Sequence, residues 1–198
     1  MGQAGTAAAA VRYLRSGPRP DPVEALPRPE LRCVREDEPL PVDPAEFRRV
    51  LGNFATGVTV VTAPAPDAEP HPAGFACQSF SSLSLDPPLV AFMVGRTSTT
   101  WPRIARAGFF CVNILGAHQG DLCRGFAVPG ADKFAGVAYD AAPASGSPRL
   151  AGTLAWIDCT IHAVHTGGDH LIVVGRVDAL GAGDEDQAPL LFHKGRFL

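Results

Sequence analysis

The stretch Ala73–Thr100 holds the residue types that could bind a flat, phosphorylated ligand. Its first part consists of small residues, so the backbone can approach a planar ring and offer it N–H and C=O groups. Its last part places a guanidinium before four consecutive hydroxyl residues: Arg96, Thr97, Ser98, Thr99 and Thr100. Arginine matches phosphate oxygens bidentately. The alternative is a Ser/Thr-rich helix cap beside a surface arginine, but the presence of both halves on either side of one strand favours a ligand site.

Strands are predicted around this stretch. Leu89–Val94 contains no polar residue, which predicts a strand buried on both faces. Before it, Ala73 begins a strand that enters a hydroxyl-rich turn and a Pro-Pro corner. The other predicted strands are Val58–Thr62, Phe109–Leu115, Thr153–Val164 and Leu171–Leu180, and Thr166–His170 is the hairpin turn between the last two. In Thr153–Val164 the alternation predicts one face made of Ala155, Ile157, Cys159, Ile161 and Ala163.

Helices are predicted at three places. Asp43 is a good N-cap, with Pro44 at the first position and Glu46 placed for a capping box. An apolar stripe then follows at helical spacing: Phe47, Val50, Leu51 and Phe54. The other two helices are Trp101–Ala107, closed by Gly108, and His118–Phe126. We expect irregular chain over Gly130–Ala141 and a loop over Ala142–Gly152.

Composition excludes several classes of function. The chain has 198 residues and a net charge of −3 without a basic stripe, so we expect no nucleic-acid partner. No apolar run approaches the ~20 residues of a membrane helix, and we predict a cytoplasmic protein without membrane contact. The five cysteines are scattered without a C-x-x-C pair, and the six histidines lack the spacing of a metal site.

The amino-acid composition divides the chain into two regions. Residues 1–42 are rich in proline and charge, which predicts a mobile or draped N-terminal arm. Residues 43–198 form the predicted domain. Strands predominate there without β-α-β alternation, so we predict a mainly β fold, a Greek-key type of barrel with two to four short helices.

The sequence resembles the short-chain flavin reductase family over about Phe47–Phe197. The matching stretches occur in the family's order: FRRVLGNFATGVTVVT, GFACQSFSSLSLDPPLV, VGRTSTTWPRI, FFCVNIL, RGFA with DKFAGV, LAWIDC, GDH and LLFHKGRF. One such match would be weak, whereas the ordered series is specific. The resemblance implies a split β-barrel and a homodimer with flavin near the subunit interface.

The resemblance also implies roles for individual residues. Phe75, Ala76, Cys77, Gln78 and Ser79 would lie along the isoalloxazine and ribityl chain, and Arg96 with Thr97–Thr100 would hold the phosphate. Further residues would border the cofactor: Lys133, Phe134, Asp169, His193 and Arg196. His170 would meet the nicotinamide as the one catalytic residue, a hydrogen-bond donor that orients it. The chain departs from the family's usual residues at Ala76, Gln78 and Phe197, which puts side-chain contacts there in question.

The implied activity is hydride transfer from NADH to FAD or FMN, with NADPH left open as a second donor. The product, reduced flavin, would diffuse to a partner monooxygenase. This chemistry needs aligned rings and no acid–base dyad, in agreement with the absence of G-x-S-x-G, P-loop and G-x-G-x-x-G motifs. The competing hypothesis is a non-enzymatic flavin or haem carrier on the same fold. A fixed-flavin amine oxidase would need an acid–base group that the sequence does not offer.

Alternative roles stay open for four of these residues. His170 could be a solvated turn histidine and Lys133 a solvated lysine. Cys77 has no basic neighbour in sequence, so we expect a small buried residue and not a nucleophile. Asn113, inside an apolar strand, must find hydrogen-bond partners, and either a loop carbonyl or a ligand could supply them.

Overall fold

The computed structural model describes residues 42–65, 71–128, 130, 132–183 and 186–198. The predicted Pro-rich arm lies outside the described residues except for Val42. The described chain belongs to two units, one that ends at Phe54 and one that spans Ala55–Leu198.

The described part of the first unit is organised by helix α2, Pro44–Leu51. The predicted N-cap is confirmed, because Asp43 Oδ1 accepts the backbone N–H groups of Ala45 and Glu46, both at 2.9 Å. The predicted capping box is wrong, since the Glu46 carboxylate pairs with Arg49 at 2.6 Å. The apolar stripe remains exposed, and no residue of α2 is buried.

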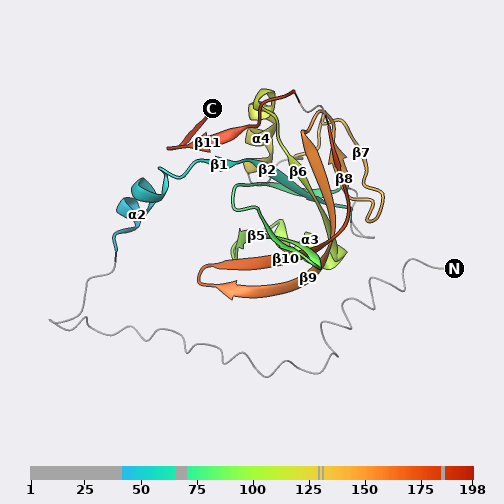
Figure 1. Ribbon diagram of the computed structural model, residues 1–198, viewed down its shortest axis with the longest axis horizontal. Helices are drawn as coiled ribbons and strands as arrows, with labels where there is room; N and C mark the ends of the chain where they lie inside the picture. The colour runs from blue at the N-terminus through green and yellow to red at the C-terminus, as the bar shows by residue number, and fades with distance from the viewer. Residues whose placement is uncertain (1–41, 66–70, 129, 131, 184–185) are drawn as a thin grey trace, which may run out of the picture. The chain divides into compact units, whose positions relative to one another are not determined.

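The second unit is built on one antiparallel sheet of seven strands in the order β3-β2-β6-β9-β10-β5-β4 (Figure 1). Its strands are β2 (Thr59–Ala63), β3 (Ala73–Cys77), β4 (Ser81–Leu85), β5 (Pro88–Gly95), β6 (Phe109–Ile114), β9 (Ala155–Gly167) and β10 (His170–Ala182). Figure 1 shows β9 and β10 as a long curved hairpin. The predicted mainly β class is confirmed.

The two edges of this sheet are consecutive in sequence. Strands β3 and β4 occupy opposite edges, yet only Gln78, Ser79 and Phe80 join them. So short a link requires the sheet to curl until its edges approach each other, which makes a split barrel. After β5 the chain returns through α3 (Trp101–Ala107) and pairs β6 with β2, a Greek-key connection.

The core fills the inside of this curled sheet with aromatic rings. Phe92 is fully buried and contacts three other rings, with centroids 5.1 Å from Phe110, 5.9 Å from Phe75 and 6.2 Å from Trp101. Trp101 comes from α3, which ends as predicted at Gly108 in the left-handed conformation, φ 77°. The cluster therefore ties α3 to β3, β5 and β6.

Strand β5 differs from its prediction. Val90, Phe92 and Val94 are buried, but Met93 between them is 43% exposed. The strand is buried on one face only, and its end, Met93 to Gly95, borders a cavity described below. The predicted hydroxyl-rich turn is also wrong in part, since Ser81–Leu85 forms the edge strand β4.

The remaining elements are short: β1 (Thr56–Gly57), the 3-10 helix η1 (Ala117–Gln119), α4 (Gly120–Ala127), β7 (Tyr139–Ala141), β8 (Pro148–Leu150), β11 (Leu191–His193) and β12 (Arg196–Phe197). Pairing of β7 with β8 corrects the predicted irregular chain and loop. The buried Asn113 side chain holds β8, since Leu150 N donates to its Oδ1 at 2.8 Å and its Nδ2 lies 3.3 Å from Pro148 O. The Asn113 side chain therefore bonds backbone groups of this segment and not a ligand.

The β9–β10 hairpin is tighter and less regular than predicted. Gly167 pairs with His170, so only Gly168 and Asp169 form the turn, with Gly168 at φ 68°. Two register shifts interrupt the alternation, and consecutive residues Asp158 and Cys159 are both fully buried. Asp158 Oδ2 accepts the N–H groups of Ala144 and Ser145 at 2.9 and 3.0 Å, which anchors the loop before β8.

Replacing Gly175 by alanine is expected to destabilise the barrel. A Cβ at Gly175 in β10 would lie 2.3 Å from Phe110 Cζ, inside the aromatic core. Overpacking of this kind costs about 1–3 kcal/mol, measurable as a lower midpoint of urea unfolding. Gly57→Ala is the control, because a Cβ there meets nothing within 4 Å. Equal stability of the two variants would contradict this packing.

Candidate functional site

A cavity of 710 Å³ opens where the end of β3 and its link to β4 approach the end of β5. Its walls come from β3, β5, the segment after β5, α4, the β9–β10 turn and the C-terminal strands. The lining residues are Val58, Phe75, Ala76, Cys77, Gln78, Ser79, Met93, Val94, Gly95, Thr97, Ser98, Thr99, Thr100, Cys123, Phe126, Ala127, Lys133, His170, Phe192 and Phe197. The volume lies in the range of about 300–1,000 Å³ found for small-molecule sites.

The first wall is the end of β3 and its link to β4, and it contains every residue predicted for the ring half of the ligand site. Ser79 fixes this wall to β5, because its Oγ lies 3.0 Å from Met93 O and accepts the Met93 N–H at 2.9 Å. Thr59 Oγ1 donates to Cys77 O at 3.0 Å. Burial raises the pKa of the Cys77 thiol, so this residue is a poor nucleophile, as predicted.

The second wall is the end of β5 and the hydroxyl run. Thr97, Ser98, Thr99 and Thr100 all line the cavity. Ser98 also accepts the backbone N–H of Trp101 at 3.2 Å, so part of its bonding capacity serves α3. The Arg96 side chain is exposed and lies outside the lining, and its backbone N–H donates to Asp169 O at 2.9 Å. A phosphate role for Arg96 stays a prediction.

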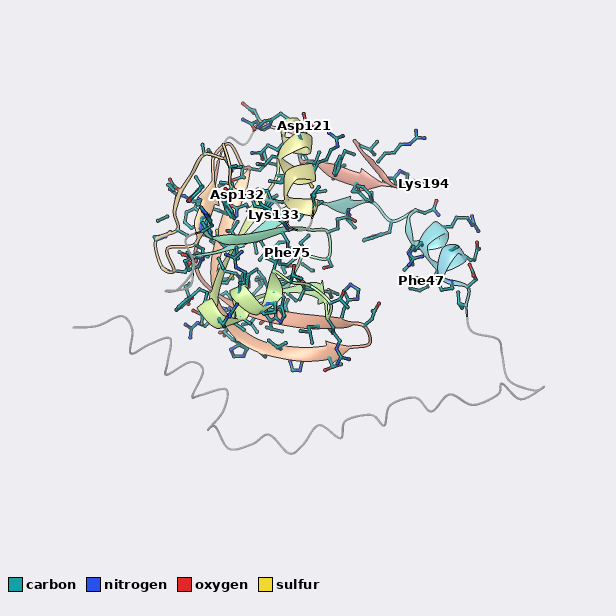
Figure 2. All side chains as sticks on the ribbon, turned by 180° about the vertical axis from the view of Figure 1, so that it is seen from behind. Phe47, Phe75, Asp121, Asp132, Lys133 and Lys194 are labelled. Atoms are coloured by element: carbon teal, nitrogen blue, oxygen red, sulfur yellow. The ribbon has the colours of Figure 1, made fainter. Side chains whose placement is uncertain are left out.

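Lys133 supplies the cation of the cavity. Its Nζ donates to Gly74 O at 3.2 Å and to Phe126 O at 3.0 Å, which joins the chain before β7 to β3 and α4. Figure 2 labels Lys133 near the end of α4. Burial lowers the pKa of Lys133, and the positive charge of Arg103 adds to this effect. The neighbouring Phe134 packs edge-on against Phe126 at 5.1 Å and does not line this cavity.

His170 reaches the cavity from the β9–β10 turn. It pairs with Gly95 in the register of β5 and β10, and its Nε2 lies 3.9 Å from the position that a Cβ at Gly95 would take. Its Nδ1 contacts Asp169 Oδ1 at 2.7 Å, and this hydrogen bond lowers the pKa of the Asp169 carboxyl. Asp169 lies outside the lining and orients the imidazole, which is 50% exposed.

The C-terminal strands turn two aromatic rings towards the cavity. Phe192 and Phe197 pair across β11 and β12 with ring centroids 5.5 Å apart, and both line the cavity. The predicted His193 and Arg196 pair on the opposite face, because side chains alternate along a strand. They are outside the lining, and their roles stay predictions.

Sequence reasoning assigned no role to the apolar half of the lining: Val58, Met93, Val94, Cys123, Phe126, Ala127, Phe192 and Phe197. A signal existed for the last two, since Lys194-Gly195 between alternating residues is a two-residue hairpin turn, with φ angles of 48° and 80°. Nothing local in the sequence indicates that α4 would cover the cavity.

The arrangement is suited to binding and aligning ligands. Among the described residues, no cluster of His, Cys, Asp or Glu could hold a metal ion. In the part of the chain that the structure describes, no helix has the length and apolar character to cross a membrane. Apolar walls beside hydroxyls, one ammonium and one imidazole would hold a flat ring with a phosphate.

Comparison with known proteins agrees with this class. The model of the flavin reductase like domain matches residues 51–198. The reductase subunit HsaB of a flavin-dependent monooxygenase from Rhodococcus jostii is 48% identical, over 79% of this chain and 77% of its own. A flavin reductase of Pseudomonas putida is 49% identical, over 79% of this chain and 89% of its own. The chain therefore belongs to the flavin reductase family.

A solved structure extends the likeness to the fold. The NADH:FAD oxidoreductase SgcE6 of Streptomyces globisporus, in complex with NAD and FAD fragments, superposes with a TM-score of 0.73. It is 37% identical, and the match covers 81% of this chain and 96% of that one. The predicted split-barrel fold and family are confirmed.

Replacing Ser79 by alanine is expected to loosen the join between the two walls. The Met93 N–H would lose its acceptor, and a hydrogen bond of this kind contributes about 0.5–1.5 kcal/mol. We expect a lower unfolding midpoint together with weaker flavin binding, measured by thermal unfolding and fluorescence titration. Ser81→Ala is the matched control, because within the described chain the Ser81 Oγ hydrogen bond goes to the adjacent Ser82 O, at 2.9 Å. An effect as large in the control would remove the special role of Ser79.

Proposed function

We propose that the chain is an NADH:flavin oxidoreductase that reduces FAD or FMN and releases the reduced flavin to a partner monooxygenase. The observation that carries the proposal is one cavity between β3 and β5 that is lined by small residues, a hydroxyl run, an ammonium and an imidazole. Family membership and the relatives' names support the same reaction.

The cavity fits a flavin on the chemistry of its lining. Ala76 and Cys77 leave the backbone of β3 accessible to a flat ring, and Met93 gives the opposite wall an apolar, adaptable surface. Thr97–Thr100 and Lys133 gather hydroxyl and ammonium donors at one end, as a phosphate requires. A bound flavin supplies the redox chemistry itself, by accepting electrons from the nicotinamide.

The chain's own residues then have three tasks. The link held by Ser79 keeps the walls of β3 and β5 together, so that the ring is aligned. Three aromatic rings of the lining exclude water from the cavity: Phe126, Phe192 and Phe197. Imidazole Nε2 of His170, with Nδ1 held by Asp169, is available to the nicotinamide as a hydrogen-bond partner.

A homodimer is part of the proposal. The edge strand β4 carries Leu85, which is 94% exposed, and Leu83, which is 55% exposed. An edge strand with apolar side chains is an association surface unless it is covered. The uncovered apolar stripe of α2 adds a second such surface. A second copy would cover both, and a cytoplasmic location suits delivery of reduced flavin to an oxygenase.

The reductase assignment predicts NADH oxidation that depends on added flavin. Purified protein is mixed with NADH and with FAD, FMN or no flavin, and absorbance of NADH is followed. We expect turnover with flavin and none without it, and NADPH tests the second donor. A protein that stays yellow through dialysis but oxidises neither nicotinamide would be a carrier, which contradicts the assignment.

Replacing His170 by alanine is expected to slow flavin reduction more than it weakens flavin binding. Losing one hydrogen bond that orients the nicotinamide costs about tenfold in rate, measured as kcat and as single-turnover flavin bleaching. His165→Ala is the control, because His165 is an exposed histidine of β9 outside the cavity lining. Unchanged rates with a raised flavin Kd would make His170 a flavin-binding residue.

A further inference from the structure

Met93 carries the exposed sulfur of the described chain. It is 43% exposed, although Phe92 and Val94 on either side of it are buried. The other sulfur-bearing residues that the structure describes are four free cysteines, each at most 5% exposed: Cys77, Cys111, Cys123 and Cys159. A small reagent that arrives from solution therefore reaches the thioether of Met93 before it reaches any of these thiols.

Burial also makes the four thiols poor partners for an oxidant. It raises the pKa of each of them, and it raises the pKa of Cys111 to about 12. Oxidants attack the thiolate, which is scarce when the pKa is high. A thioether has no proton to lose, so its oxidation requires only access to the oxidant. Exposure and chemistry both select Met93.

Met93 is held in the lining of the proposed flavin site. It lines the 710 Å³ cavity at the end of β5. Ser79 Oγ accepts the Met93 N–H at 2.9 Å and lies 3.0 Å from Met93 O, and β5 pairs Met93 with Ile172 of β10. With both backbone groups fixed, the residue cannot move out of the lining when its side chain changes.

The proposed reaction leads to an oxidant of suitable chemistry. Dioxygen takes two electrons and two protons from reduced flavin that no oxygenase consumes, and becomes hydrogen peroxide. A thioether sulfur then takes one oxygen atom from the peroxide. The O–O bond breaks, an S–O bond forms, the sulfur loses two electrons and the second oxygen leaves as water. The product is methionine sulfoxide, a polar side chain that methionine sulfoxide reductases convert back.

Building on the proposed function, we propose that the Met93 thioether is a site of oxidation by peroxide, and that its sulfoxide weakens flavin binding when reduced flavin accumulates. The unmodified side chain gives the wall of β5 an apolar, adaptable surface for a flat ring. The sulfoxide puts a polar S–O group on that surface, and the bonds to Ser79 keep it there. The reductase then slows when its product is not used, and reduction of the sulfoxide restores it.

The test is treatment of the flavin-free full chain with hydrogen peroxide, followed by peptide mass spectrometry and fluorescence titration with FMN. We expect one added oxygen atom on Met93 and an FMN Kd raised about threefold to tenfold. Methionine sulfoxide reductases A and B then restore the original Kd, which they would not do for oxidised thiols. Saturating FMN during the treatment slows the oxidation, because the bound ring covers the thioether.

Two variants separate the thioether from the thiols. Met93→Leu conserves volume but has no sulfur, and we expect peroxide to leave its FMN Kd at the value of its own untreated form. Cys33→Ser removes the one cysteine that lies outside the described residues, and we expect peroxide to weaken its FMN binding as in the unmodified chain. Weakened binding in treated Met93→Leu, or resistance of Cys33→Ser, would contradict the proposal.

Three further results would overturn it. The first is no oxygen on Met93 at a peroxide concentration that oxidises free methionine. The second is a sulfoxide at Met93 with an unchanged FMN Kd, and the third is equal oxidation with and without FMN.

A second arm of the experiment uses turnover in place of added peroxide. The chain is incubated with NADH and FMN in air, and we expect the same sulfoxide at Met93, which catalase prevents. Turnover without this sulfoxide would overturn the proposal. Absence of NADH oxidation would instead contradict the reductase assignment, because the arm with added peroxide reports on Met93 without turnover.

Discussion

The short link between opposite edges of one sheet is the constraint on which the rest of the barrel depends. Because only Gln78–Phe80 join β3 to β4, the sheet must curl, and β3 comes to face β5. Ser79 completes the approach through both backbone groups of Met93. The exposed face of β5, the small residues of β3 and the hydroxyl run after β5 then border one cavity. The binding site is a consequence of the way the barrel closes.

The same geometry determines which segments supply the flat walls of the cavity and which supply its polar groups. Strands supply flat, accessible walls, and the segments that leave them supply the polar groups: Thr97–Thr100 after β5, and His170 at the start of β10. Lys133 arrives from a distant segment, and its hydrogen bonds to Gly74 O and Phe126 O hold it in place. A Cβ at Gly74 would lie 2.8 Å from Phe126 Cε1, so the close approach of α4 that closes this side requires glycine. The protein aligns its ligands and leaves electron transfer to them.

Local chemistry explains which features the sequence could predict. The N-cap at Asp43, the C-cap at Gly108 and the Gly168-Asp169 turn depend on neighbouring residues and could be recognised directly. The small-residue and hydroxyl halves of the site were predicted for the same reason. Burial of β5 was misjudged, because an apolar strand beside a cavity has the same composition as one inside a core. Phe126 and the Asp158 anchor depend on long-range packing and bulges, which local patterns do not specify. His193 and Arg196 were assigned from the resemblance alone, and strand alternation places them on the face opposite Phe192 and Phe197, which line the cavity.

The central claim is that flavin binds between β3 and β5, where the curled sheet brings these two strands together. Hydrogen–deuterium exchange with and without saturating FMN tests it most directly. Slower exchange is predicted over Phe75–Ser79 and Thr97–Thr100, on both walls together, with no change in the β7–β8 hairpin. That hairpin borders a separate cavity of 410 Å³ beside Trp156. Protection confined to the β7–β8 hairpin, or to one wall alone, would contradict the account.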